Sequence, residues 1–177
     1  MQGPVYGIST NESAQDARLM PNFHYDEVFG TVLNRFVVQA VAGYPLTVYG
    51  KGGQTRGYLN LRDTMQCIKL AIENPASAGE LKIYNQVTET FSVNDLAARV
   101  SEAGKSMGYD VQIKQIENPR IEKEDHYYNP VYTGLKELGL KPNLLTPEVL
   151  KEFFTMVSKH KGRINTSAIF RGVKWNR

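Results

Sequence analysis

The most informative stretch of the sequence is LTVYGKGGQTRGY, residues 46–58. An apolar strand at 46–49 runs into a glycine-rich turn at 50–53, and a second strand follows at 57–61. The glycines allow a tight turn and a close approach to a ligand, and Gln54 and Arg56 add hydrogen-bond donors just beyond it. A guanidinium group suits a phosphate or diphosphate. A hairpin that ends in a solvated Arg56 explains the same residues, so this stretch alone leaves both interpretations open.

Two familiar phosphate-binding loops do not fit this stretch. A Walker loop ends in Gly-Lys-Ser/Thr after four spacer residues, and the GKGG run at 50–53 lacks the terminal hydroxyl. A dinucleotide fingerprint places a third glycine where Thr55 stands. We therefore expect that this loop does not bind NAD.

Strands and helices alternate on both sides of this stretch. Val28, Val32 and Phe36 recur at i, i+4 steps, which predicts an amphipathic helix over about residues 25–41. Asp63 can cap a helix that ends near residue 74, and Ser92 can cap another that runs to about residue 100. The other expected elements are a strand at 2–8, a polar loop at 9–26, strands at 81–85 and around 111–116, and helices at about 130–138 and 146–160.

This alternation favours an α/β or α+β layer architecture. The expected strands at 2–7 and 81–85 have the apolar character of central sheet strands, yet the chain offers them few neighbours. We therefore expect part of their sheet to lie upstream of Met1.

Composition narrows the class of protein. The 177 residues are 41% hydrophobic and 22% charged, which predicts one globular domain, residues 1–177. The net charge of +3 is small and its 21 basic residues are interleaved with 18 acidic ones, which argues against nucleic acid and membrane surfaces as partners. Cys67 is the single cysteine, and no apolar run approaches the ~20 residues of a membrane span.

A second polar cluster is NPRIEKEDHYYN, residues 118–129. Its arginine, histidine, tyrosines and asparagine could reach phosphate, ribose and a base edge, but a charged surface loop explains them as well. Tyr132 and Lys136 have the spacing of a dehydrogenase Tyr-Lys pair; however, they lie in an expected exposed helix with a glycine stop, so we interpret the pair as non-catalytic. No histidine has triad or metal-ligand spacing, and no metal is expected.

These residues resemble a known family. Val5-Tyr6-Gly7, the GKGGQTR run at 50–56 and the LGLKP run at 138–142 are similar to the extended short-chain dehydrogenase/reductases that act on nucleotide sugars. The VFGT run at 28–31, the HYYN run at 126–129 and the VKW run at 173–175 look specifically like its sulfite-using branch. The resemblance implies an α/β fold: the carboxy-terminal, substrate-binding part of such an enzyme, with the last strands of an incomplete Rossmann sheet.

The resemblance also implies roles for individual residues. Gln2 would touch the nucleotide sugar beside the nicotinamide, and residues 31–34 would receive the diphosphate and uridine at a helix start. Residues 47–49 would flank the uracil, while Arg56 and Arg120 would clamp the diphosphate. Many members of the family carry an Asp that binds the ribose soon after the second arginine. This sequence has Glu122 near that position, so a ribose-binding role for Glu122 is a hypothesis. The implied substrate-binding residues are Gln2, Thr31, Val32, Leu33, Asn34, Thr47, Val48, Tyr49, Gln54, Arg56, Arg120, Glu122, His126 and Asn129.

In the branch that it resembles, NAD oxidises C4 of UDP-glucose, water is lost from C5 and C6, sulfite adds at C6, and the hydride returns to C4 to give UDP-sulfoquinovose for sulfolipid head groups. The resemblance implies that NAD is bound mainly by an amino-terminal half absent from this chain, that the complete enzyme is a homodimer in a bacterial cytoplasm or chloroplast stroma, and that this chain alone is inert. A free-standing nucleotide-sugar-binding module, or part of a UDP-sugar epimerase or dehydratase, remains an alternative.

Overall fold

The computed structural model describes residues 1–26, 28–118 and 130–169. The chain divides into two compact units. The first unit takes its described residues from Met1–Pro21, Arg56–Thr90 and Tyr128–Leu145, and the second takes them from Asn22–Thr55, Phe91–Tyr127 and Thr146–Arg177.

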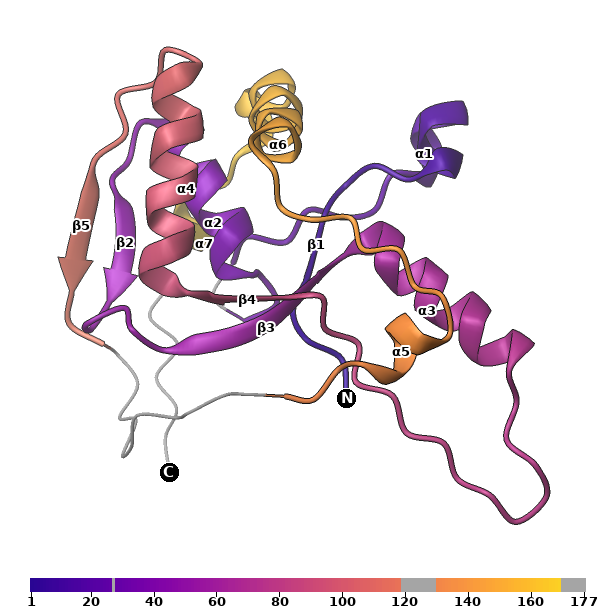
Figure 1. Ribbon diagram of the computed structural model, residues 1–177. Coiled ribbons are helices and arrows are strands. Elements are labelled where there is room, and N and C mark those ends of the chain that lie inside the picture. The colour runs from indigo at the N-terminus through magenta and orange to yellow at the C-terminus, as the bar shows by residue number, and fades with distance from the viewer. Residues whose placement is uncertain (27, 119–129, 170–177) are drawn as a thin grey trace. The chain divides into compact units, whose positions relative to one another are not determined.

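The first unit contains most of a three-stranded sheet (Figure 1). Its order is β1 (Val5–Tyr6), β3 (Thr55–Asn60) and β4 (Glu89–Ser92), and β1 pairs with β3 in parallel. The segment before β1 approaches β3 closely at Gly3, where an added Cβ would lie 2.3 Å from the Gly57 carbonyl oxygen. The short helices are α1 (Asn11–Gln15), η1 (Ala17–Leu19) and α5 (Gly134–Glu137), and the long one is α3 (Leu61–Glu73).

The core of the first unit forms where α3 meets the sheet and the α5 segment. Leu59, Cys67, Leu135 and Leu140 are buried together there. Burial, with a contribution from the charge of Asp63, raises the pKa of the Cys67 thiol to about 11. The single cysteine is therefore a core residue in this structure.

The second unit combines a two-stranded parallel sheet with helices. The strands are β2 (Leu46–Tyr49) and β5 (Ile113–Ile116), in the register Leu46↔Ile113 to Tyr49↔Ile116. Figure 1 shows α4 beside these strands. The helices α2, α4 and α6 pack on one another and bury Phe36, Val100 and Phe154. Their bounds are α2 Val32–Ala42, α4 Val93–Ser106 and α6 Pro147–Lys159, followed by η2 Lys161–Arg163 and α7 Thr166–Ile169.

The mixed α/β class and several helix starts agree with the sequence-based prediction. Ser92 caps α4 through a capping box with Asp95, and Thr146 caps α6 with Pro147 in its first turn. No helix in the described part of the chain is both long and apolar enough to cross a membrane.

Residues 81–85 do not form the predicted strand. Leu81 and Ile83 alternate as in a strand but are 81% and 74% exposed, and pairing at this point is limited to an isolated bridge between Gln2 and Gln86. The strand forms at Glu89–Ser92 instead. Alternation alone predicted the wrong segment, because a strand also needs a neighbour that pairs with its backbone.

Two helix starts were also wrong. The helix predicted from residue 25 begins at Val32, because the Asp26 carboxylate accepts hydrogen bonds from the backbone N–H groups of Val28 and Phe29 and holds a turn there. The helix α3 is capped by Asn60 and not by Asp63. The predicted loop at 9–26 contains α1, which Thr10 caps through a capping box.

Candidate functional site

The predicted residues 31–34 form the amino terminus of α2. Thr31 is the N-cap, and its hydroxyl accepts a hydrogen bond from the Asn34 backbone N–H at 3.2 Å. The first N–H groups of a helix have no partners within the helix, and the helix dipole makes this end favourable for negative charge. The structure therefore places Thr31, Val32, Leu33 and Asn34 where an anionic group could be bound.

Asn34 carries an additional signal. Asn34 is only 8% exposed, and its side-chain Nδ2 donates a hydrogen bond to the His24 carbonyl oxygen at 2.9 Å. Its Oδ1 is buried and has no hydrogen-bond partner among the described residues. Buried polar atoms are rarely left unsatisfied in native proteins, so this oxygen is an acceptor that a ligand N–H or O–H group could use.

The predicted residues 47–49 lie in β2, on which α2 packs. One edge of β2 pairs with the β5 segment, as shown by bonds from the Leu46 N–H to the Gln112 carbonyl (2.8 Å) and from the Gly50 N–H to the Ile116 carbonyl (2.9 Å). Because alternate residues of a strand direct their backbone groups to opposite edges, those of Thr47 and Tyr49 face the other edge. Gln54 reaches that edge, with its Nε2 at 3.5 Å from the Tyr49 carbonyl oxygen.

The glycine-rich stretch is not a hairpin, because β2 and β3 belong to different sheets. Gly50 and Gly52 have left-handed φ values of 60° and 71°. The turn is held by Asn94 at the start of α4, whose N–H donates to the Gly52 carbonyl (3.0 Å) and whose Nδ2 donates to the Lys51 carbonyl (2.9 Å). Gly52 is therefore required for a close contact within the protein.

Two predicted residues belong to the first unit. Gln2 is exposed and forms the bridge with Gln86, and Arg56 is half-buried in β3. Beside Arg56, burial raises the pKa of Tyr58 to about 12, although the arginine charge works against this rise. Four further predicted residues, Arg120, Glu122, His126 and Asn129, lie outside the described residues.

Comparison with curated proteins gives relatives that span the chain. It is 53% identical over 176 residues to a chloroplast UDP-sulfoquinovose synthase of Spinacia oleracea, and 44% identical over 179 residues to a UDP-sulfoquinovose synthase of Sulfolobus acidocaldarius. By sequence, the chain belongs to the UDP-sulfoquinovose synthase family. The matches cover 99% and 100% of this chain but only 36% and 45% of the two relatives, and they correspond to a carboxy-terminal part of the synthases. The chain matches no protein-family model.

Solved structures support the predicted fold. A UDP-glucose 4-epimerase of Thermotoga maritima with UDP-glucose aligns with 92% of this chain and 45% of its own, at a TM-score of 0.63 and 23% identity. A UDP-glucuronic acid 4-epimerase of Bacillus cereus in complex with UDP-glucuronic acid and NAD aligns with 90% and 44%, at a TM-score of 0.63 and 16% identity. The synthase-family chain thus has the fold of the corresponding part of extended short-chain dehydrogenase/reductases.

The sequence-based prediction did not identify two residues that lie beside the predicted site. Arg35 and Gln39 lie one turn apart on α2, and both are buried, at 8% and 0% exposure. Both side chains bond to Thr47 of β2. The sequence signal that could have found them is a polar i, i+4 pair within the mostly apolar run VLNRFVVQAVA at 32–42.

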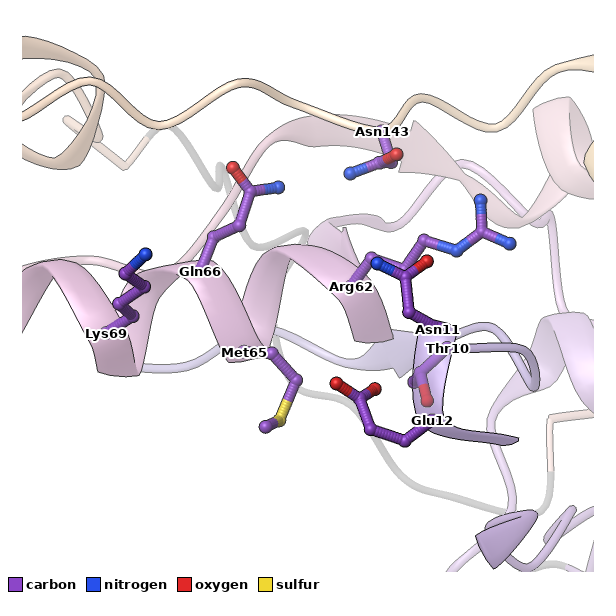
Figure 2. Close-up of a pocket in the computed structure, with 8 residues that line it drawn as sticks. All are labelled: Thr10, Asn11, Glu12, Arg62, Met65, Gln66, Lys69 and Asn143. Carbon is purple, nitrogen blue, oxygen red and sulfur yellow. The ribbon is translucent and has the colours of Figure 1, made fainter. Parts of the chain in front are cut away.

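A polar pocket of about 640 Å³ in the first unit contains none of the predicted site residues. Figure 2 shows its lining: Thr10, Asn11, Glu12, Arg62, Met65, Gln66, Lys69 and Asn143. Several of its polar groups are already used within the protein. Arg62 donates to Ser9, and Asn143 donates to the buried Asp63, whose pKa is raised by that burial. The pocket therefore has a structural explanation, and we assign no ligand to it.

Tyr132 and Lys136, which have the spacing of a dehydrogenase pair, contact each other in the structure. The Lys136 ammonium lies over the Tyr132 ring, 4.8 Å from its centroid, at the start of α5. Among the described residues, no group of three His, Cys, Asp or Glu side chains could hold a metal ion.

Proposed function

We propose that this chain is the nucleotide-sugar-binding part of a UDP-sulfoquinovose synthase, which makes UDP-sulfoquinovose from UDP-glucose and sulfite. The observation that carries the proposal is the amino terminus of α2, where a capped helix start and the buried acceptor Asn34 Oδ1 lie together. The relationship to the synthases over the whole chain supports the identity of the ligand. Alone, the chain binds the nucleotide sugar without converting it.

In this proposal, the helix start receives the diphosphate and the uridine. The backbone N–H groups after Thr31 and the helix dipole offset negative charge. Asn34 Oδ1 accepts a hydrogen bond from the ligand, for which a base N–H or a ribose hydroxyl has the right polarity. The partly exposed Tyr49 then flanks the uracil ring, while Gln39 and Arg35 hold the polar groups of Thr47 beside it.

The remaining assignments rest on the resemblance. Arg56 and Arg120 bind the diphosphate as planar, permanently charged donors, and Gln54 lies at the same strand edge as Tyr49. Gln2 contacts the sugar. Glu122, His126 and Asn129 contact the ribose or the base.

NAD belongs to the complete synthase in this proposal, but the glycine-rich turn does not suit it. A Cβ at Gly52 would lie 2.2 Å from the Asn94 side-chain oxygen, so the protein itself occupies the space that a dinucleotide cradle would need. The proposal therefore places NAD mainly on parts of the synthase outside this chain, and the described residues serve to bind and orient the nucleotide sugar. The sulfite donor and a homodimer of the complete enzyme belong to the same proposal.

Titration of UDP against the chain by calorimetry tests the assignment. Replacing Arg56 with alanine is expected to weaken UDP binding by roughly 1.5–3 kcal/mol, the range for a hydrogen bond to a charged group. The matched control is Arg62→Ala, an arginine of the same unit whose guanidinium bonds to Ser9. Equal affinities for Arg56→Ala and the unaltered chain would contradict the diphosphate role, and Arg120→Ala tests the second arginine in the same way.

A second candidate is suggested by the epimerase structures that share this fold, namely part of a UDP-sugar epimerase or dehydratase. The two functions differ in their product. Incubating the complete enzyme with UDP-glucose, NAD and sulfite should give a sulfonated nucleotide sugar. A 4-epimer without any sulfonate, detected by mass spectrometry and NMR, would reject the synthase assignment.

A further inference from the structure

The edge of β2 that faces away from β5 is occupied by side chains of α2. Gln39 is fully buried, and both ends of its amide bond to one residue of the strand. Its Nε2 donates to the Thr47 hydroxyl at 2.7 Å, and its Oε1 accepts from the Thr47 backbone N–H at 3.0 Å. The Gln39 amide thus provides the hydrogen-bond acceptor for the Thr47 N–H that a neighbouring strand would otherwise supply.

Arg35 completes this arrangement one helical turn earlier. Its Nη2 donates to the Thr47 carbonyl oxygen at 3.2 Å, and its guanidinium carbon lies 4.4 Å from the centroid of the Tyr49 ring. The backbone N–H, the backbone carbonyl and the hydroxyl of Thr47 are therefore all held by two side chains of one helix. That same helix carries Thr31 and Asn34 at its amino terminus.

We propose that Gln39, assisted by Arg35, is a positioning residue for uridine recognition, an inference that rests on the proposed function. It does not touch the nucleotide. It fixes the position of β2 along α2. It thereby sets the spacing between the helix start, which binds one part of the nucleotide, and Tyr49, the partly exposed strand residue that flanks the uracil. Such spacing matters because a hydrogen-bonding site loses binding energy when its groups are displaced by a fraction of an ångström.

Replacing Gln39 with methionine tests this role. The two side chains have similar volumes, so the change removes both hydrogen bonds while leaving the core filled. The Thr47 N–H loses its acceptor and the strand edge is freed to shift. We expect the affinity for UMP, measured by calorimetry, to fall about tenfold, as for one displaced hydrogen bond. We also expect the Thr47 amide to exchange with solvent at least about tenfold faster by NMR, because a broken bond opens without wider unfolding.

The matched control is Ser158→Ala. Ser158 of α6 shares a hydrogen bond with Tyr109, which lies beyond α4, so this change also removes one side-chain bond from the second unit. It should lower the melting temperature without changing UMP affinity or Thr47 exchange. A UMP affinity that falls equally in both variants would show general destabilisation and would overturn the positioning role.

The remaining outcomes separate this inference from the proposed function. If the unaltered chain binds UMP and Gln39→Met binds it equally well, the positioning role is wrong and nucleotide binding stands. If Thr47 exchanges rapidly in the unaltered chain, the Gln39 contact does not hold the strand in solution, and the positioning role is again wrong. If the folded, unaltered chain does not bind UMP, the proposed binding site is rejected, and the positioning role with it.

Discussion

Gly52 and Gly53 are neighbours in the turn after β2, but the structure requires glycine at only one of them. At Gly52, φ is 71°, and an added Cβ would lie 2.2 Å from Asn94 Oδ1 and 2.6 Å from Val48 Cγ1. At Gly53, an added Cβ would have no heavy atom within 4 Å. Only Gly52 therefore needs to be glycine, because of its positive φ and its close contacts with Asn94 and Val48.

We predict that Gly52→Ala lowers the free energy of unfolding by about 1–3 kcal/mol, through the unfavourable φ and the clash. Gly53→Ala is the matched control and should leave stability within ~0.5 kcal/mol, as for a surface change with no special contact. Urea unfolding followed by circular dichroism measures both. Equal stabilities of the two variants would mean that Gly52 is not held against Asn94 in solution.

At the scale of elements, the helices whose ends carry local signals were predicted well. Ser92 and Thr146 cap α4 and α6 as expected, because a cap bonds to a backbone group within three residues along the chain. The strands were predicted less well. The alternation at 81–85 did not produce a strand, while β4 formed at Glu89–Ser92, because strand formation depends on a partner that is distant in sequence.

The cap of α4 offers a test at this scale. Ser92 Oγ accepts from the Asp95 N–H at 3.0 Å, and the Asp95 carboxylate accepts from the Ser92 N–H at 2.9 Å. Ser92→Ala should lower the free energy of unfolding by about 1 kcal/mol, the usual loss for an N-cap. The control is Ser106→Ala at the other end of α4. Ser106 is exposed, and its hydroxyl donates to the Ala103 carbonyl oxygen of the same helix (2.7 Å) and caps no N-terminus, so the change should cost less than ~0.5 kcal/mol. Thermal unfolding compares the two, and equal losses would contradict the capping role.

For the whole molecule, the chain spans 36% and 45% of the lengths of two UDP-sulfoquinovose synthases. Its first unit exposes several large apolar side chains, among them Ile72 on α3 and Leu81 and Ile83 in the following segment. Leu81 and Ile83 lie two residues apart and are both largely exposed, and exposed apolar surface favours association when it is contiguous.

We therefore predict that the double change Leu81→Lys and Ile83→Lys reduces self-association of the chain without destabilising it. Both side chains are largely exposed, so the free energy of unfolding should stay within ~0.5 kcal/mol of the unaltered value. Analytical ultracentrifugation at several concentrations measures the association. A large loss of stability would instead show that these side chains are packed within the chain.

The sequence by itself determined the mixed α/β class, the family and the caps of α4 and α6. These features depend on side chains only a few positions apart, or on motifs whose order along the chain is itself the evidence. Only the tertiary structure decided that β2 pairs with β5 and that β3 pairs with β1. It alone also showed that Gln39 and Arg35 hold Thr47. The physical reason is that a strand edge can be satisfied by another strand or by buried side chains, and long-range packing makes that choice.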